Sequence, residues 1–228
     1  MFQIGPQPPP FPPPAAPLLV PAEVTRAKLA AELSDWDANS AIYQRRGWVL
    51  LERGDRHVVV AFIAAVPFVG VTTLPIVTAC VHIDYSNYDL RPPSVTFIDP
   101  RTRQPTPPAV RAPGTSELGV RDALVDGHPL TGRPFLCLPG IREYHDHPQH
   151  SGDSWLLHRA SGAGRLAVIC ERIWQRMVTN VVGLRVVVQA LPPAIGTQVE
   201  VLLAQGDLTI PEQPTPVMGM PGMPQPPS

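Results

Sequence analysis

The stretch from Val58 to Ile83 constrains the fold most, because it contains no aspartate, glutamate, lysine or arginine. It is long enough to cross a bilayer as a helix. However, Pro67, Gly70 and Pro75 interrupt it, and β-branched residues dominate on both sides of these breaks. The stretch therefore predicts two buried strands joined by a turn, with no membrane-spanning segment.

The neighbouring segments predict a helix and further strands around this pair. A helix is expected over Glu23 to Ala38, with an apolar face made of Val24, Ala27, Leu29, Ala31, Leu33 and Trp36. A helix followed by four closely spaced strands indicates an α+β fold with a four-stranded antiparallel meander. The predicted strands are Gly47–Arg53, His57–Val66, Leu74–Asp84 and Ser94–Ile98, with a turn at Gly54-Asp55 between the first two.

The second half of the chain is less regular. Asp99 to Gly119 is rich in proline, threonine and arginine and predicts a long surface loop. Gly164 to Val182 predicts a C-terminal helix, because its apolar residues recur three or four positions apart. From Leu184 to Ile210 the pattern leaves strands and helix equally open. These elements predict one domain over residues 22–210.

Composition separates this domain from its two ends. Many of the 31 prolines gather there, so residues 1–21 and 211–228 are expected to be extended or disordered tails. The net charge of -1 gives no general attraction to nucleic acid or to an acidic membrane. Three cysteines, an odd number with no recognisable secretory leader, predict reduced thiols and a cytoplasmic location. Cys80 and Cys170 lie on apolar faces and are expected in the core.

Four landmarks then occur in the order found in ubiquitin-conjugating enzymes. The segment Tyr88-Asp89-Leu90-Arg91-Pro92-Pro93-Ser94-Val95-Thr96-Phe97 resembles the signature that links the third and fourth strands of that family, with Asp89 in place of its first proline. His128-Pro129-Leu130 is similar to the family's His-Pro-Asn tripeptide. Phe135-Leu136-Cys137-Leu138 resembles the segment around its catalytic cysteine, and Trp155 matches the tryptophan before its next helix. The resemblance implies a ubiquitin-conjugating-enzyme-like fold over about Glu23 to Val182.

The same resemblance implies a function and partners. Cys137 would be the thioester-forming nucleophile and His128 part of the catalytic segment, with a ubiquitin-like modifier and its activating enzyme as partners. Leu130 departs from the family, because its side chain cannot donate the hydrogen bond that the family's asparagine amide gives to the oxyanion. Loss of such a donor costs about 2.7 to 4 kcal/mol of transition-state stabilisation, which argues against ordinary transfer to lysine.

An insertion over residues 137–155 carries most of the metal-binding residue types. It contains a thiol, a carboxylate and several imidazoles on a loop turned by prolines and glycine, and these are the donors that bind zinc tetrahedrally. The pattern also resembles a predicted metal-binding family named for its Cys, Glu, His and His residues and encoded beside bacterial ubiquitin-like proteins. That resemblance implies the ligand set Cys137, Glu143, His145 and either His147 or His150. We favour His150, because alternate residues of an extended loop point apart.

These residues leave several functions open. Cys137 is predicted as a zinc ligand, with two alternatives: a thioester nucleophile activated by His145 or His150, or a buried structural residue. The main hypothesis is a metal-binding, conjugating-enzyme-like component of a bacterial ubiquitin-like modification system. The alternatives are an active conjugating enzyme and a zinc-dependent hydrolase with Glu143 as its base. The histidines could also be no more than a solvated loop.

Overall fold

The structure is a computed structural model that describes residues 18–68, 72–108, 124–125 and 127–179, and the backbone of strands over 181–191 and 194–203. Most of the two predicted tails, and residues 109–119 of the predicted loop, lie outside these ranges. The first half of the chain contains α1 (Ala22–Ala38), α2 (Ser40–Arg45), β1 (Trp48–Arg53), β2 (His57–Phe68), β3 (Thr72–Asp84) and β4 (Ser94–Phe97). The second half contains β5 (Leu124–Val125), β6 (Phe135–Leu136), α3 (Arg142–His145), η2 (Pro148–His150), α4 (Trp155–His158), η3 (Arg159–Ser161), α5 (Leu166–Met177), β7 (Val181–Leu191) and β8 (Ala194–Leu203).

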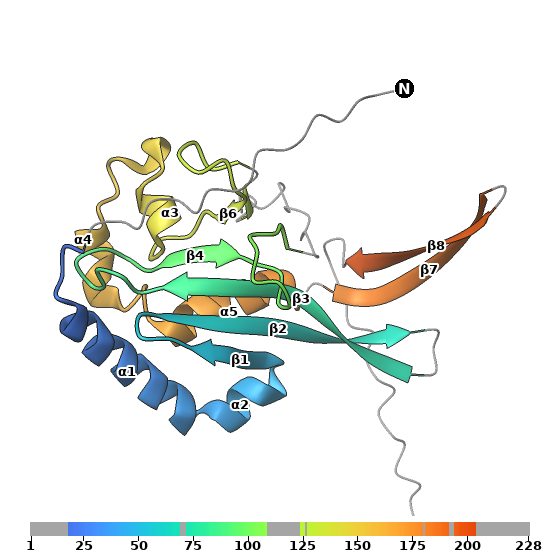
Figure 1. Cartoon of the computed structure of the whole chain (residues 1–228), viewed down its shortest axis with the longest axis horizontal. Helices are drawn as coiled ribbons and strands as arrows, with labels where there is room; N and C mark the ends of the chain where they lie inside the picture. The colour runs from blue at the N-terminus through green and yellow to red at the C-terminus, as the bar shows by residue number, and fades with distance from the viewer. Residues whose placement is uncertain are drawn as a thin grey trace, which may run out of the picture.

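Strands β1 to β4 form the predicted antiparallel meander, so the fold is α+β, and helices α1 and α5, from the two ends of the domain, pack on one face of these four strands (Figure 1). The uncharged stretch forms the β2–β3 pair, as the sequence predicts. Its register is fixed by pairs such as Val58 with Ile83 and Val60 with Val81. In the part of the chain that the structure describes, no helix has the length and apolar character needed to cross a membrane.

One face of the sheet and two helices enclose the main core. Val58, Val60 and Phe62 alternate along β2 toward this face and are fully buried. Leu29 and Trp36 of α1 and Ile169, Cys170, Ile173 and Met177 of α5 pack in the same cluster. The opposite face of β2 and β3 carries a second, smaller cluster made of Val59, Ala61, Cys80 and Ile98. Both Cys80 and Cys170 are therefore core residues, as predicted.

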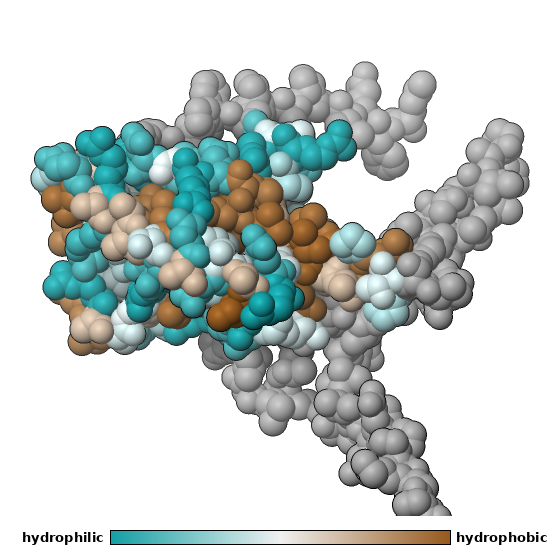
Figure 2. Space-filling model, turned by 90° about the horizontal axis from the view of Figure 1, so that it is seen from below, coloured by the Kyte–Doolittle hydropathy of each residue, from teal (hydrophilic) through white to brown (hydrophobic). Residues whose placement is uncertain are grey.

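Helix α1 confirms the predicted element and corrects its predicted face. Its buried residues are Thr25, Leu29 and Trp36, whereas Val24 is 40% exposed. Figure 2 views the molecule from below and shows hydrophobic patches among hydrophilic residues on that face. Leu33 is partly buried against the same core, whereas Ala27 and Ala31 are exposed, so the buried face of α1 is narrower than the predicted one.

The end of the domain corrects the sequence prediction more strongly. The predicted helix over Gly164 to Val182 is shorter, because α5 ends at Met177 and Val181 already belongs to β7. The β-branched pair Val181-Val182 favours a strand over a further helical turn. The region from Leu184 onwards, which the pattern left open, forms an antiparallel β7–β8 hairpin. It meets the sheet where Leu184 pairs in parallel with Phe68 of β2, and it extends beyond the four-stranded part (Figure 1).

Candidate functional site

Cys137 follows directly after the short strand β6, and its neighbours fix it in place. Strand β6 pairs with β5, and both its residues are buried. Leu136 and Leu138, on either side of Cys137, are 0% and 5% exposed, whereas Cys137 itself is partly exposed. Two anchored leucines therefore present the thiol at the surface while holding its backbone still.

The turn at Pro139-Gly140, directly after Cys137 and Leu138, is held against α5 and the residues before it. Gly140 has a φ of +103°, and a Cβ at this position would lie 2.5 Å from the carbonyl oxygen of Ala163. Only glycine fits this left-handed conformation and close approach without strain. The guanidinium of Arg172 on α5 donates a hydrogen bond to the carbonyl of Pro139. This turn fixes where α3 and η2 begin, and therefore where their side chains lie relative to Cys137.

The thiol of Cys137 contacts the imidazole of His150. Cys137 Sγ lies 3.2 Å from His150 Nε2, which is hydrogen-bonding distance for sulfur and nitrogen. The Tyr144 ring stacks on the His150 ring with centroids 4.0 Å apart and 19° between planes. Among the described residues no carboxylate hydrogen-bonds the His150 ring, so stacking is the main contact that orients it. The pair can share one proton between sulfur and imidazole.

Tyr144 is itself held by Asp153. The phenol donates a 2.7 Å hydrogen bond to Asp153 Oδ2, and His158 Nε2 lies 2.5 Å from Asp153 Oδ1. Burial, followed by this bond to Asp153, raises the pKa of Tyr144 to about 12. The hydrogen bonds from His158 and Tyr144 lower the pKa of Asp153. Tyr144 therefore stays a neutral donor and Asp153 an anionic acceptor at neutral pH, so the ring that supports His150 is fixed.

Glu143 points away from Cys137. Its carboxyl accepts hydrogen bonds from the Ser94 hydroxyl and, at 3.0 Å, from the Val95 backbone N–H, and so joins α3 to β4. Burial raises the pKa of Glu143, although both hydrogen bonds oppose the shift. A side chain engaged with β4 is not available as a ligand beside Cys137, and it is not positioned as a base there.

His145 is likewise occupied by structural contacts. Its Nδ1 donates to the Asp153 carbonyl at 2.8 Å, and its Nε2 accepts from the Gly140 N–H at 3.2 Å. These two bonds define a neutral tautomer, and burial lowers the pKa of His145 in agreement. His145 therefore braces the loop between the Gly140 turn and α4, and both of its possible ligand atoms are used.

His147 lies beside the pair without a direct bond to the thiol in the structure. Its ring centroid is 5.4 Å from that of His150, and it stacks on Phe135 at 5.5 Å. Burial, followed by the neighbouring His128 and His150, lowers the pKa of His147. It is the second imidazole near Cys137, and at neutral pH it is uncharged.

His128 is structural in this arrangement. It is 2% exposed, its Nε2 donates to the Glu143 carbonyl at 2.9 Å, and its Nδ1 accepts from the Leu130 N–H at 3.2 Å. Both nitrogens are therefore engaged in holding the turn between β5 and β6 against α3. Leu130 follows on the surface with 70% exposure. The sequence predicts a catalytic role for His128; in the structure it lines a pocket, with both ring nitrogens bonded to backbone groups.

The predicted four-ligand set is not brought together. Cys137 and His150 are adjacent, whereas Glu143 and His145 face other partners. Across the described ranges, no group of three or more histidine, cysteine, aspartate or glutamate side chains is arranged to hold a metal ion. A tetrahedral zinc site requires four donors about 2.0 to 2.3 Å from one point, so the residues in these positions do not fit the expected metal. Sequence reasoning did not single out Tyr144, because its ring contact with His150 depends on the fold of the loop.

The fold and the site define a class: an α+β protein with a partly exposed cysteine–histidine pair on a loop beside an antiparallel sheet. Residues 20–112 and 118–181 match the Y4jH-like family. The chain is 36% identical to "Uncharacterized protein y4jH" of Sinorhizobium fredii (strain NBRC 101917 / NGR234) over 216 residues, which cover 86% of this chain and 97% of that protein. The chain belongs to the Y4jH family.

Proposed function

We propose that this protein is a conjugating-enzyme-like component of a bacterial ubiquitin-like modification system in which Cys137 carries the modifier as a thioester. The observation that supports this most is the 3.2 Å contact between Cys137 Sγ and His150 Nε2. A thiol next to an imidazole loses its proton more readily and becomes a better nucleophile. The landmarks around Cys137 add the resemblance to ubiquitin-conjugating enzymes, including the entry to β4 after Pro92-Pro93.

The chemistry of loading balances with the groups at this site. His150 accepts the proton of the Cys137 thiol, and the thiolate attacks the carbonyl carbon of the modifier's terminal thioester on the activating enzyme. A new carbon–sulfur bond forms to Cys137 as the bond to the activating enzyme's sulfur breaks. The imidazolium of His150 then returns its proton, and the leaving group departs as a thiol. The reaction needs no metal ligand and no oxidant.

Onward transfer is the weaker part of the proposed reaction. The exposed Leu130 side chain cannot donate a hydrogen bond to an oxyanion, and such a donor is worth about 2.7 to 4 kcal/mol. We therefore propose a protein that accepts the modifier readily and passes it to an amine slowly, unless another protein supplies the missing donor. The main role proposed for the protein is therefore to carry the modifier.

The metal-binding alternative makes a different use of the same cysteine. It requires Glu143 to leave Ser94 and Val95, or His145 to leave Gly140 and Asp153. Each departure strands buried or paired groups and costs free energy. A zinc-bound thiolate is also not free to attack a thioester, so the two functions are separable by experiment.

The test is a loading assay with a ubiquitin-like modifier and activating enzyme from the same organism. We expect an adduct that is lost on treatment with excess thiol and absent in Cys137→Ala. His150→Gln is expected to slow loading about 100-fold or more, the ordinary contribution of a positioned base. His57→Gln, at the start of β2 where the ring contacts Glu52 and His82, is the matched control and is expected to load normally.

Three results would overturn the proposal: no adduct, an adduct that resists thiol, or one that survives in Cys137→Ala. Zinc content, measured on the same samples purified without a metal-binding tag, separates the alternative. About one zinc per chain, lost in Cys137→Ser, would make Cys137 a ligand instead of a nucleophile.

A further inference from the structure

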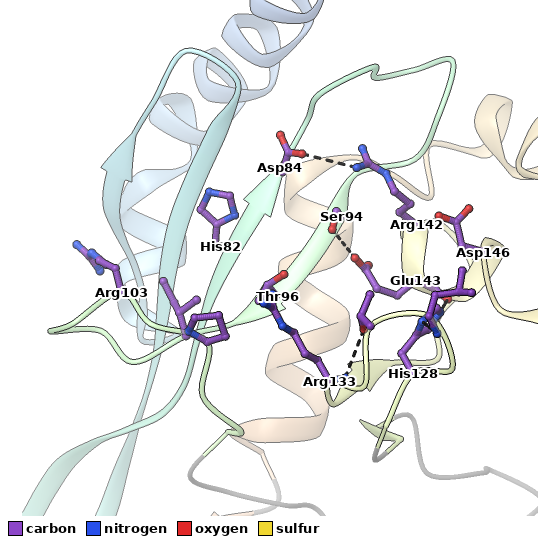
Figure 3. Close-up of a pocket in the computed structure, with 14 residues that line it drawn as sticks. His82, Asp84, Ser94, Thr96, Arg103, His128, Arg133, Arg142, Glu143 and Asp146 are labelled. Atoms are coloured by element: carbon purple, nitrogen blue, oxygen red, sulfur yellow. Dashed lines mark hydrogen bonds and ion pairs between the residues drawn. The ribbon is translucent and has the colours of Figure 1, made fainter. Parts of the chain in front are cut away.

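A concave site lies on the face of the sheet opposite the main core. Figure 3 shows this pocket, whose volume is about 540 Å³. One wall is the outer face of β3 and β4, and the other is the turn between β5 and β6 together with one side of α3. Volumes of about 300 to 1,000 Å³ are typical of sites for small molecules. Cys137 is not among the lining residues.

The negative groups of this pocket are already satisfied. Three carboxyl groups line it, and each accepts hydrogen bonds or forms ion pairs within the protein. The contacts are Asp84 with Ser86 and Arg142, Asp146 with Arg91, and Glu143 with Ser94 and Val95. The lining therefore has little remaining capacity to accept hydrogen bonds from a ligand.

The groups without partners are donors. Arg133 lines the pocket, and within the described part of the chain its guanidinium has no carboxylate or hydrogen-bond partner. Thr96, which faces the pocket from β4, has no hydrogen bond from its hydroxyl among the described residues. In Figure 3 the Arg133 side chain extends toward Thr96. A guanidinium and a hydroxyl beside each other form a partial cradle for an anionic oxygen pair.

The other basic groups at the pocket are either paired with a carboxylate or uncharged. Arg103 lies 3.6 Å from Glu52, and Arg142 lies 3.6 Å from Asp84, so both have a counterion in the protein. Burial lowers the pKa of His82, which therefore adds no positive charge at neutral pH. The lining holds three arginines and three carboxyl groups, and Arg133 is the arginine that has no carboxylate partner among the described residues. A carboxylate ligand adds one negative charge opposite Arg133, whereas a dianion such as phosphate adds two beside the lining carboxyl groups and is repelled more strongly.

From these observations we propose that the pocket is a binding site for a small molecule or peptide end that bears a carboxylate, held by Arg133 and Thr96. The site is separate from the thioester chemistry proposed for Cys137 and does not depend on it. The two sites share α3, which presents Arg142 and Glu143 to the pocket and Tyr144 and His145 to the loop that holds Cys137; Asp146, directly after α3, also lines the pocket.

The proposal can be tested on the full chain with a pair of matched probes. N-Acetylglycine carries one carboxylate, and N-acetylglycinamide differs only by the loss of that charge. Each is titrated at constant ionic strength while backbone amide resonances are followed by NMR. We expect saturable shifts around Thr96 and Arg133 with the carboxylate probe and none with the amide.

Variants identify the residues responsible. Arg133→Gln is expected to weaken binding of N-acetylglycine at least about tenfold, because a charge-assisted hydrogen bond is lost. Thr96→Val removes one neutral hydroxyl, keeps the β-branched shape of a strand residue, and is expected to weaken binding about 2- to 13-fold. Arg45→Gln removes an exposed arginine from α2, outside the pocket, and is expected to bind as the wild type does.

Four outcomes would overturn the proposal. These are no saturable shift with N-acetylglycine, equal binding of the amide, and wild-type affinity in both Arg133→Gln and Thr96→Val. The fourth is displacement of N-acetylglycine by inorganic phosphate at a lower concentration, which would assign the pocket to phosphate chemistry.

Discussion

Replacing Tyr144 with leucine is expected to slow the alkylation of Cys137, because the Tyr144 ring is the main contact that holds His150 against the thiol. The two rings stack with centroids 4.0 Å apart. Such a contact is worth about 0.5 to 1.5 kcal/mol beyond the area it buries. At about 1.36 kcal/mol for each factor of ten, the equilibrium constant for His150 lying beside Cys137 falls about 2- to 13-fold.

The rate of reaction with iodoacetamide near pH 7 measures this population, since the thiolate is the species that reacts. Of the three cysteines, only Cys137 is expected to react with iodoacetamide. Cys80 and Cys170 are buried, and burial raises the pKa of both thiols, to about 11 for Cys80. The observed rate constant for Tyr144→Leu is therefore expected to fall by up to about 13-fold, in step with the His150 population.

Tyr144→Phe provides the matched control for this measurement. It keeps the ring over His150 and removes only the hydroxyl that donates to Asp153. We expect its alkylation rate to stay close to that of the wild type, while the free energy of unfolding falls by about 1.5 to 3 kcal/mol for a hydrogen bond to a charged group. The reasoning is refuted if Tyr144→Leu reacts as fast as the wild type, or if Tyr144→Phe slows the reaction equally.

Other predictions concern stability. Burial raises the pKa of Glu143 above 4.5, so the folded state holds this proton more tightly and stability falls as pH rises from about 4.5 through the folded pKa. The gain in unfolding free energy from Glu143→Gln should therefore grow with pH over that window in urea titrations, and a constant gain would contradict this. Burial lowers the pKa of His145 below 6.5, so the stability that its neutral form contributes is lost as pH falls from about 6.5 through the folded pKa. The free energy of unfolding of His145→Asn should therefore fall less than that of the wild type between pH of about 7.5 and 5.5. Phe62→Ala, at 0% exposure, should lower the unfolding free energy by about 3 to 5 kcal/mol. Leu157→Ala, at 72% exposure, should change it by less than about 0.5 kcal/mol; similar losses would refute the core assignment.

The sheet could be predicted from the sequence because its information is local. An uncharged, β-branched stretch broken by proline and glycine has few other stable arrangements, and β2 and β3 follow it closely. The paired prolines before Ser94 likewise fix the start of β4. The C-terminal strands were left open by the sequence, because the valine-rich segment from Leu184 carries no period that separates strand from helix.

The candidate site could likewise be predicted only in part. Residue types on the loop after Cys137 predicted that a thiol and imidazoles would be close to each other, and the structure places Cys137 beside His150. Which histidine it would be, and whether Glu143 would join them, depended on the direction of α3. That helix turns Glu143 toward β4 and Tyr144 toward His150. The spacing of these residues along the sequence does not indicate these directions.

The sequence by itself determined the alternation of strands, the reduced core cysteines and the gathering of reactive side chains after β6, since each follows from spacing and composition along the chain. Tertiary structure alone decided the partners of those side chains. His128 and His145 became braces because the fold brought a backbone group to each nitrogen of each ring. The pocket beside Arg133 also exists only because α3 and the turn after β5 pack across the outer face of the sheet. Hydrogen bonds are short-ranged and directional, so such pairings are set by the folded geometry.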